Sequence, residues 1–400
     1  MSLPTYFYLS LPLLLSGCFD SSPPTGNNST DSIIEVSGHG GNGATGIYTY
    51  GLDELADKPL RVTKGDTPGT CNMSNTNFEL RNGWENGSVE NPIPDGFWSD
   101  YYPREILTFP CPTKNEILQH DQDKRNGSFS PINDTWFILN NAVPFYEELS
   151  GELPMSEKIT IISHYLFGAN AQYVRPDHEY APDQFKNNIL ISDGIHRDGS
   201  GIEYTYSFAT SDILVHELTH AYTGKKGHSF EKINALRDSL GGWSEHFSDI
   251  IAEYYQFKTT GKTDLIHGAD HIKCNISDSD CSTNVRDFKN PQYKNVIDAI
   301  SDQGKNSLDE LEVHIIGDTL NYSFYLLLKD DNYGVFTLDE LIEIYIHAEK
   351  NVWKLNPSSS SKDLVDGLIS SASALDYSDE KTSKIKEAFT QTGFYSDLPL

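Results

Sequence analysis

Basic residues are scarce in this sequence, and long apolar runs are absent. Its 400 residues include 30 Lys and Arg against 58 Asp and Glu, which gives a formal net charge of −28. This balance argues against nucleic-acid binding, because the release of counterions from phosphates needs clusters of Lys and Arg. Anionic membrane surfaces also recruit basic clusters. No run reaches the ~18 apolar residues of a transmembrane helix, so we expect membrane contact only through a lipid anchor.

The N-terminus has the pattern of an export signal. Residues 6–15 are apolar, too few to span a bilayer but typical of a signal-peptide core. They end in Leu15-Ser16-Gly17-Cys18, which resembles the bacterial lipobox, whose cysteine is lipidated. We therefore expect a lipoprotein-type signal peptide at residues 1–18 and a flexible tether at 19–38. Asp20 is not adjacent to Cys18, which favours the outer membrane or cell surface; an ordinary cleaved signal and secretion are the alternative.

Cysteine is also rare, with five residues and no CxxC pair. Cys18 for lipid leaves an even number, and four exported cysteines indicate two disulfides. Proximity in the sequence favours the pairs Cys71–Cys111 and Cys274–Cys281. A zinc site built from these four cysteines is the less favoured alternative.

The pattern of predicted secondary structure changes near residue 210. Residues 39–210 contain short β-type runs such as 46–50 and 158–162, separated by Gly, Pro and Asn, with one helix expected at 135–148. Residues 211–400 show longer helical patterns, which we place at 212–223, 242–258, 311–328, 338–351, 362–374 and 379–390. The two segments predict an α+β fold of two lobes, a β-rich one at 39–210 and an α-helical one at 211–400, with a cleft between them.

The first helix of the second lobe carries His216-Glu217-Leu218-Thr219-His220. Positions i and i+4 of an α-helix lie about 40° apart, so both imidazoles point the same way. Two neutral imidazoles suit Zn²⁺, and Glu217 is placed to take a proton from a metal-bound water.

A second acidic pair follows on the next predicted helix. Glu245 and Asp249 have i,i+4 spacing and share one helix face. Glu245 supplies a third zinc ligand and leaves one position open for water. Asp249 is placed to accept a hydrogen bond from the other ring nitrogen of a ligating His.

These motifs resemble those of the thermolysin-type (gluzincin) metallopeptidases, and the N-terminal half resembles the vibriolysin branch in particular. The likeness covers essentially the whole mature chain. It includes the segments Asp212-Ile213-Leu214-Val215, Ala221-Tyr222-Thr223, Gly46-Ile47-Tyr48-Thr49-Tyr50-Gly51 and Ser130-Pro131-Ile132-Asn133-Asp134. The resemblance implies the two-lobed thermolysin-like fold with the zinc helix at the junction of the lobes.

Further residues are implied by position in the family pattern. Val313-His314, followed by Asn321 and Tyr325, matches the helix whose His stabilises the oxyanion or protonates, and Asp309 would orient His314. Arg286 with Pro291 matches the segment whose Arg binds a substrate carbonyl. The family pattern also implies substrate contacts at Asn170 and Ala171, on an edge strand that pairs with the peptide, and at Ile213 and Val285, in an apolar pocket.

The sequence departs from the family in four respects. Phe230 falls near a position where a Tyr usually assists the oxyanion, and Ile316-Gly317-Asp318 replaces a small polar run. Asp212, Asp264 and Glu253 are candidate calcium ligands, but Ile266 and Ala269 stand where further carboxylates are expected; plain solvated acids are the alternative. Only about 20 residues separate Cys18 from the first family-like segment, so the usual long propeptide is not expected.

We therefore expect a monomeric zinc endopeptidase that hydrolyses peptides or proteins before bulky apolar residues. Zn²⁺ on His216, His220 and Glu245 would activate water with Glu217 as the base. A surface-anchored pseudo-peptidase that binds peptides with little turnover is the main alternative. An exopeptidase of the same HExxH class is a third interpretation.

Overall fold

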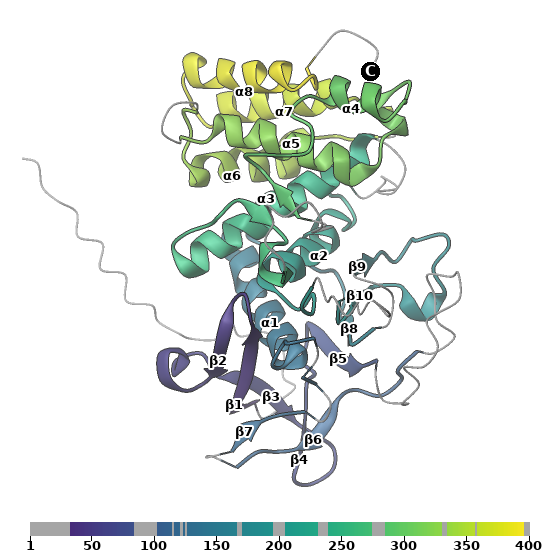
Figure 1. Cartoon of the computed structure of the whole chain (residues 1–400), viewed down its shortest axis with the longest axis vertical. Coiled ribbons are helices and arrows are strands. Elements are labelled where there is room, and N and C mark those ends of the chain that lie inside the picture. The colour runs from purple at the N-terminus through teal and green to yellow at the C-terminus, as the bar shows by residue number, and fades with distance from the viewer. Residues whose placement is uncertain are drawn as a thin grey trace, which may run out of the picture. The chain divides into compact units, whose positions relative to one another are not determined.

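Two β-sheets and a long helix occupy the first half of the chain, and helices dominate the second half (Figure 1). The computed structural model describes residues 33–83, 102–113, 116–120, 123–124, 126–165, 170–194, 205–230, 239–273, 285–329, 334–356 and 358–395. The described residues belong to one compact unit. The predicted α+β class is confirmed.

The first sheet has the strand order β2-β1-β3-β4-β6, and β7 pairs with β1. Its strands are β1 (Ile33–Asn42), β2 (Gly46–Tyr50), β3 (Leu60–Lys64), β4 (Thr70–Asn72), β6 (Thr108–Pro110) and β7 (Ile117–Leu118). The Cys71–Cys111 disulfide joins β4 to the residue after β6, as the sequence predicted. It closes a loop of 40 residues across neighbouring strands, which restricts the unfolded chain.

The second sheet has the order β5-β8-β10-β9. Its strands are β5 (Phe78–Asn82), β8 (Ile159–Ser163), β10 (Asn188–Ile191) and β9 (Ala171–Val174). β5, β8 and β10 are parallel, whereas β9 runs antiparallel to β10 in an outer position. Runs of buried Ile and Leu in β8 and β10 fit strands that are covered on both faces. A short third pairing joins β11 (Ile266–His267) and β12 (Arg286–Asp287).

Helix α1 (Pro131–Ser150) contacts strands of both larger sheets. Ser130 caps its first turn by accepting a hydrogen bond from the Asn133 N–H, Pro131 occupies the first helical position, and Gly151 ends the helix at φ +75°. Asp134 accepts hydrogen bonds from the Gly41 N–H and from the hydroxyls of Tyr48 and Tyr50. Residues 46–51 and 130–134, the two N-terminal segments of the family pattern, are therefore in contact, because Asp134 in the first turn of α1 hydrogen-bonds the β1–β2 hairpin.

The helices after α1 begin at residue 211. They are α2 (Ser211–Thr223), α3 (Ser239–Thr260), α4 (Val296–Asp302), α5 (Val313–Leu327), α6 (Leu338–His347), α7 (Ser361–Ala374) and α8 (Asp379–Gln391). A π-helical turn, Ala348–Val352, continues α6. Within the described chain, 3₁₀ turns lie at Asp53–Leu55, Asp183–Phe185, Ala269–His271 and Leu308–Glu310. The predicted helices agree to within a few residues, and the short α4 was not predicted.

One hydrophobic core runs through both halves of the chain. It takes in Leu60 and Val62 of the first sheet, Trp136 of α1, Leu214 of α2 and Trp243 of α3. Helix α2 packs against α1, β9 and α3, and α3 packs against α5. These contacts place α2 between the sheets and the helices of the second half (Figure 1). The division at residue 210 stays a prediction, because the described residues form one unit.

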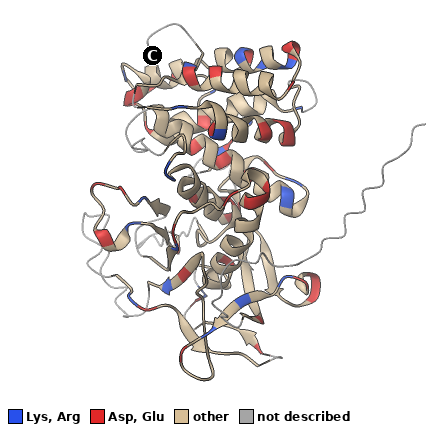
Figure 2. Cartoon of the chain, turned by 180° about the vertical axis from the view of Figure 1, so that it is seen from behind, with Lys and Arg blue, Asp and Glu red and all other residues tan. Residues whose placement is uncertain are grey.

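The end of the predicted tether is wrong. Ile33 to Val36 belong to β1 and pair with β3, so the backbone of residues 33–38 is held in a sheet. Residues 1–32, Cys18, Cys274 and Cys281 lie outside the described residues. None of the described helices has the length and apolar character needed to cross a bilayer. Acidic side chains recur along the described helices and loops (Figure 2).

Candidate active site

Helix α2 presents its two histidines to the same point. The ring centroids of His216 and His220 lie 4.7 Å apart, and their Nε2 atoms are 3.0 Å apart. His216 Nδ1 lies 2.8 Å from Asp249 Oδ1, and His220 Nδ1 lies 3.3 Å from the hydroxyls of Ser244 and Ser248. These contacts at Nδ1 direct both Nε2 lone pairs into the space between the helices.

Glu245 enters the same space from α3. Its Oε2 is 3.3 Å from His216 Nε2, and its Oε1 is 3.3 Å from His220 Nε2. The carboxylate is buried, and among the described residues no donor makes a hydrogen bond to Oε2. Burial raises the pKa of Glu245, but the neighbouring histidines hold it well below its usual value.

The donor set fits zinc. His216, His220 and Glu245 form a group whose ligand atoms all lie within 4.8 Å of one another. Two imidazole nitrogens and one carboxylate oxygen are ligands that Zn²⁺ accepts with a position left open. A bound cation would explain both the buried carboxylate oxygen that lacks a hydrogen bond and the two lone pairs that face each other.

Asp249 links the histidines to a buried network. Its carboxylate bonds to His216 Nδ1 and accepts hydrogen bonds from Arg286 Nε and Nη2, at 2.6 and 2.5 Å, and from Asn321 Nδ2, at 2.8 Å. Burial would raise the pKa of Asp249, but Arg286 and His267 hold it well below its usual value. Asp249 therefore remains charged and fixes the orientation of His216, as expected for this position.

Arg286 is committed to Asp249 in the structure. The sequence resemblance assigned it to a substrate carbonyl, yet both Nε and Nη2 bond the Asp249 carboxylate. Contact with substrate stays a prediction for the remaining Nη1. The Asp249 pair also shows why this position is an Arg, whose planar group can bind a carboxylate with two parallel hydrogen bonds.

Glu217 lies on the sheet side of α2. Its Oε2 accepts a hydrogen bond of 2.6 Å from the backbone N–H of Tyr173, which lies on β9. Ala171 is the first residue of this outer strand and pairs with Ile191 of β10, and Asn170 directly precedes it; their contact with substrate stays a prediction. The predicted general base and the predicted peptide-binding strand are thus joined by one hydrogen bond.

His314 comes from the first turn of α5 and lies beside the donor group. Its Nε2 is 3.4 Å from Glu245 Oε2, and its side chain is 51% exposed. Its Nδ1 bonds to Glu312, which also caps α5 by accepting from the backbone N–H of His314 and Ile315. The predicted partner was Asp309, and this assignment is wrong: Asp309 accepts a hydrogen bond from the Ser239 N–H at the start of α3.

The two apolar pocket residues have different surroundings. Ile213 is 8% exposed and belongs to the core, whereas Val285 is partly exposed just before β12. Their contact with a substrate side chain stays a prediction. Phe230 is buried against Phe247 and Trp353, so it is a core residue rather than a substitute for an oxyanion donor.

The unusual run after His314 has a packing explanation. Ile316 is fully buried, and a Cβ added to Gly242 of α3 would lie 2.2 Å from its Cγ2. A Cβ on Gly317 would lie 3.0 Å from the Cβ of Glu245. Glycine on each helix therefore lets α5 approach α3 closely, at the level of Glu245. Asp318 accepts a hydrogen bond from the Gln292 N–H, and burial raises its pKa to about 7.

The candidate calcium ligands do not form a comparable group. Asp212 accepts hydrogen bonds from the Thr210 hydroxyl and from the backbone N–H of Ile213 and Gly268. Asp264 accepts from the Ile266 N–H. Among the described residues, the groups with metal-ligand spacing are the zinc-type set and a second one of His216, Asp249 and His267. That second group shares the Asp249 carboxylate with Arg286, which opposes a further cation.

Sequence reasoning did not find three residues of the site. Glu312 orients His314; His267 lies with its ring centroid 4.8 Å from that of His216; and His246 bonds Asn321 and Tyr345. Burial lowers the pKa of His246 to about 4, so it is neutral and accepts a hydrogen bond from one of these partners. Of these three, only Glu312 could have been identified from the sequence, because it lies two residues before His314.

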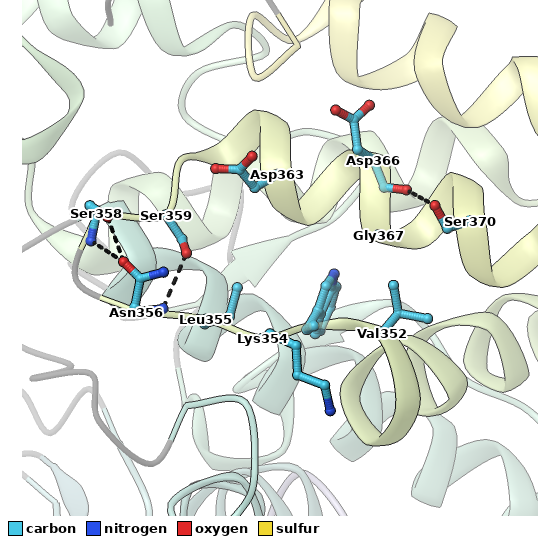
Figure 3. A pocket seen from close by; sticks show the side chains of 11 residues that line it. Val352, Lys354, Leu355, Asn356, Ser358, Ser359, Asp363, Asp366, Gly367 and Ser370 are labelled. Atoms are coloured by element: carbon cyan, nitrogen blue, oxygen red, sulfur yellow. Dashed lines mark hydrogen bonds between the residues drawn. The ribbon is translucent and has the colours of Figure 1, made fainter.

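A separate surface pocket has no part in this site. It measures about 420 Å³ and lies between the π-helical turn and α7 (Figure 3). Its polar groups bond one another: Asn356 Oδ1 accepts from the Ser358 N–H, and the Asp366 carbonyl accepts from the Ser370 hydroxyl. The zinc-type donors, Glu217 and His314 do not line it.

Comparisons with known proteins agree with the site. Residues 235–394 match the family model of the thermolysin metallopeptidase alpha-helical domain. The chain is 25% identical over 361 residues to the hemagglutinin/proteinase of Vibrio cholerae, covering 89% of this chain and 49% of that protein. It is 25% identical over 358 residues to the neutral protease of Vibrio proteolyticus, covering 89% and 48%.

A relative from another genus is also named as a metalloproteinase. The zinc metalloproteinase MspA of Legionella longbeachae is 24% identical over 348 residues, covering 86% of this chain and 57% of that protein. The chain spans about half the length of the Vibrio relatives that it matches. The HExxH helix, the third carboxylate and these relatives point the same way: residues 235–394 match the helical domain of the thermolysin-type metallopeptidases, and the chain as a whole is similar to the Vibrio proteases of that type.

Proposed function

We propose that this protein is a zinc-dependent endopeptidase that hydrolyses peptide bonds before bulky apolar residues. The observation that supports this most is the convergence of His216 Nε2, His220 Nε2 and the Glu245 carboxylate. His216, His220 and Glu245 would hold Zn²⁺, which supplies a Lewis acid that acidifies water and polarises the scissile carbonyl.

Glu217 is the general base of the proposal. It follows His216 directly on α2, and its carboxylate is held by the Tyr173 N–H at 2.6 Å. Glu217 takes a proton from the attacking water and later passes it to the leaving amine. The hydrogen bond from Tyr173 leaves the other carboxylate oxygen, Oε1, to carry this proton.

His314 is the proposed donor to the developing oxyanion. Its side chain is half exposed, and its Nδ1 is held by Glu312, so Nε2 is the nitrogen directed at the donor group. One well-placed donor to an oxyanion contributes roughly 3–4 kcal/mol. Because Glu312 is an acceptor for Nδ1, it supports the protonated imidazole that can donate from Nε2.

β9 is the proposed contact for the substrate backbone. It occupies an outer position in the second sheet, where a peptide can add as one more strand. The preference for bulky apolar residues rests on Ile213 and Val285, as implied by the family resemblance. Arg286 Nη1 would bind a carbonyl beyond the scissile bond.

The two alternatives predict different products. The full set of Glu217, His314 and three zinc-type donors argues against a pseudo-peptidase with little turnover. An exopeptidase would release single amino acids. We would therefore incubate the zinc-loaded protein with a peptide library, with and without a chelator, and analyse the products by mass spectrometry.

The decisive control is Glu217→Gln with zinc bound. Internal cuts that need zinc and disappear in this variant are the expected result. Release of single amino acids would indicate the exopeptidase, and binding of peptides without cleavage by the wild type would indicate the pseudo-peptidase. Full cleavage by Glu217→Gln would show that the mechanism is wrong.

We also propose export with lipid attachment at Cys18, and zinc as the metal of the site. The Cys71–Cys111 disulfide supports an oxidising compartment. Labelling with a fatty-acid analogue, compared between the wild type and Cys18→Ser, tests the anchor. Calcium at Asp212 and Asp264 is not part of this proposal, because these acids lack metal-ligand spacing within the described residues, and the thermal scan described below tests this.

A further inference from the structure

A buried histidine outside the zinc group is held between two carboxylates. His164 Nδ1 lies 2.6 Å from Asp193 Oδ1, and its Nε2 lies 3.1 Å from Asp123 Oδ1. His164 is 2% exposed, and Asp123 is 1% exposed. Asp123 also bonds the Ser130 hydroxyl and the Ile132 N–H at the start of α1. The mechanism proposed above uses none of these groups.

The backbone of His164 is unusual as well. It follows the last residue of β8 and has φ +59°, in the left-handed region that few residues other than Gly adopt. Burial lowers the pKa of the imidazole, but Asp193 and Asp123 outweigh burial and raise it to about 9. The imidazole is therefore charged at neutral pH, and its two ion pairs offset the backbone cost.

The Asp193 end of this arrangement reaches the predicted peptide-binding strand. Asp193 follows Ser192 and strand β10, and Asn126 Nδ2 donates to the Asp193 carbonyl. Ser192 Oγ accepts from the Asn170 N–H at 3.1 Å, and the Ser192 N–H donates to the Asn170 carbonyl at 3.1 Å. Asn170 is thus held by the residue next to Asp193.

Further along β9, the strand contacts Glu217, the proposed general base. Ala171 pairs with Ile191, and two residues further along β9 the Tyr173 N–H bonds Glu217. The Tyr165 N–H, next to His164, donates to the Ile191 carbonyl at 2.8 Å. A shift of β10 at Asp193 would therefore move β9 and the donor that holds Glu217.

We infer that His164, clamped between Asp123 and Asp193, is a positioning residue that sets the register of the peptide-binding strand β9 and, through Tyr173, the orientation of Glu217. This inference rests on the proposed function, because it assumes that substrate pairs with β9. His164 does not touch substrate in this scheme; it acts through Ser192, Asn170 and Tyr173.

The test is His164→Asn, compared with a matched control. Asn tolerates positive φ but cannot bridge both carboxylates, so the variant removes the clamp and keeps the turn. His228→Asn is the control, because the partly buried His228 also lies between two carboxylates, Glu349 at 2.8 Å and Glu152 at 3.4 Å, on the loop after α2. Asp193→Asn is a milder second variant that keeps the imidazole if His164→Asn does not fold.

Substrate length separates positioning from general destabilisation. With folded, zinc-loaded protein, we expect the KM of a ten-residue peptide to rise roughly tenfold in His164→Asn, because backbone hydrogen bonds to β9 are misaligned. The KM of a blocked dipeptide substrate, which makes few such bonds, should change less than about threefold. His228→Asn should raise neither KM. Equal losses for both substrates, or no loss for either, would overturn the inference.

Hydrogen exchange gives a readout that does not need activity. We expect faster amide exchange in residues 171–174 of His164→Asn, and unchanged exchange there in His228→Asn. Unchanged exchange in the first variant would overturn the inference even if activity fell. A wild-type protein that cleaves neither substrate would instead overturn the proposed function, and the exchange measurement would still decide whether His164 positions β9.

Discussion

Glu312 binds His314 twice: its carboxylate bonds the ring Nδ1 and accepts a hydrogen bond of 3.0 Å from the backbone N–H of the same residue. One side chain therefore both caps α5 and orients the imidazole. We predict that Glu312→Gln lowers kcat roughly 10- to 100-fold, with a smaller change in KM, because the donor to the oxyanion loses its orientation.

Asp309→Asn is the matched comparison for Glu312→Gln. Asp309 bonds the Ser239 N–H rather than His314, so this variant should retain most of its kcat. Steady-state kinetics on one internally cleaved peptide measure both effects. A larger loss of kcat in Asp309→Asn than in Glu312→Gln would restore the original assignment from sequence.

Asp249 should control zinc affinity. Its charge is held by Arg286 and directed at His216 Nδ1, so Asp249→Asn removes the acceptor that fixes this ligand. We expect zinc binding to weaken by about 10- to 100-fold. Competition with a fluorescent zinc chelator measures the affinity, and Asp264→Asn, at an exposed position outside the zinc-type group, serves as the control. Equal zinc affinity in wild type and Asp249→Asn would contradict the role.

The close contact between α3 and α5 should tolerate no extra methyl group at Gly242. An added Cβ would lie 2.2 Å from Ile316 Cγ2, so Gly242→Ala should lower the free energy of unfolding by about 1–3 kcal/mol. Adding Ile316→Ala removes Cγ2 but leaves the Ile316 Cβ, 2.4 Å from the added atom, so the losses of stability of the two single variants should be less than additive. Urea unfolding and kinetics of the single and double variants test this; additive losses would show that the two residues do not interact.

The buried carboxyl group of Asp134 should make the stability of the fold depend on pH. Burial is the largest cause, and it raises the pKa of Asp134 from 3.8 to about 7 in the folded protein. A carboxyl group with a raised folded pKa stabilises the fold fully below its unfolded pKa, and this contribution is lost as the pH rises through about 7.

Asp134→Asn isolates this contribution, because its amide does not titrate. The stability of the wild type relative to this variant should fall between pH 4 and pH 8, by up to about 4 kcal/mol. Urea unfolding of both proteins at several pH values gives the difference. A difference that rises with pH would mean that the carboxylate, held by Gly41, Tyr48 and Tyr50, is charged in the fold.

Calcium should have little effect on this protein. The Asp212 oxygens already accept three hydrogen bonds, and the acids around it lack the spacing of a metal site within the described residues. Zinc-saturated protein in calcium-free buffer should therefore keep its Tm when calcium is added. A specific site at a hundred times its Kd would add about 2.7 kcal/mol, which a thermal scan detects.

The zinc-type group could be predicted because its geometry is local. His216 and His220 share a helix face by spacing alone, and α2 begins one residue before its predicted start. Glu245 and Asp249 needed only the further assumption that α3 packs on α2. Periodicity also gave α7 and α8 nearly to the residue, since each begins after a Ser that caps it.

Contacts between distant segments could not be predicted in this way. The choice of Glu312 over Asp309 depends on the backbone angles of the residue before α5, and spacing alone does not report them. His267 reaches His216 only because β11 pairs with β12 beside α3. The start of β1 was missed because Ile33 to Val36 are ordered by β3 rather than by their own sequence.

The outer position of β9 has a consequence for the choice of target. A peptide that joins the second sheet as a strand must lie extended over several residues, with its backbone amides free to pair. A helical or tightly folded segment cannot meet this condition until it opens. Local unfolding of the target protein, as much as the side chain next to the bond, would then decide where the proposed endopeptidase cuts.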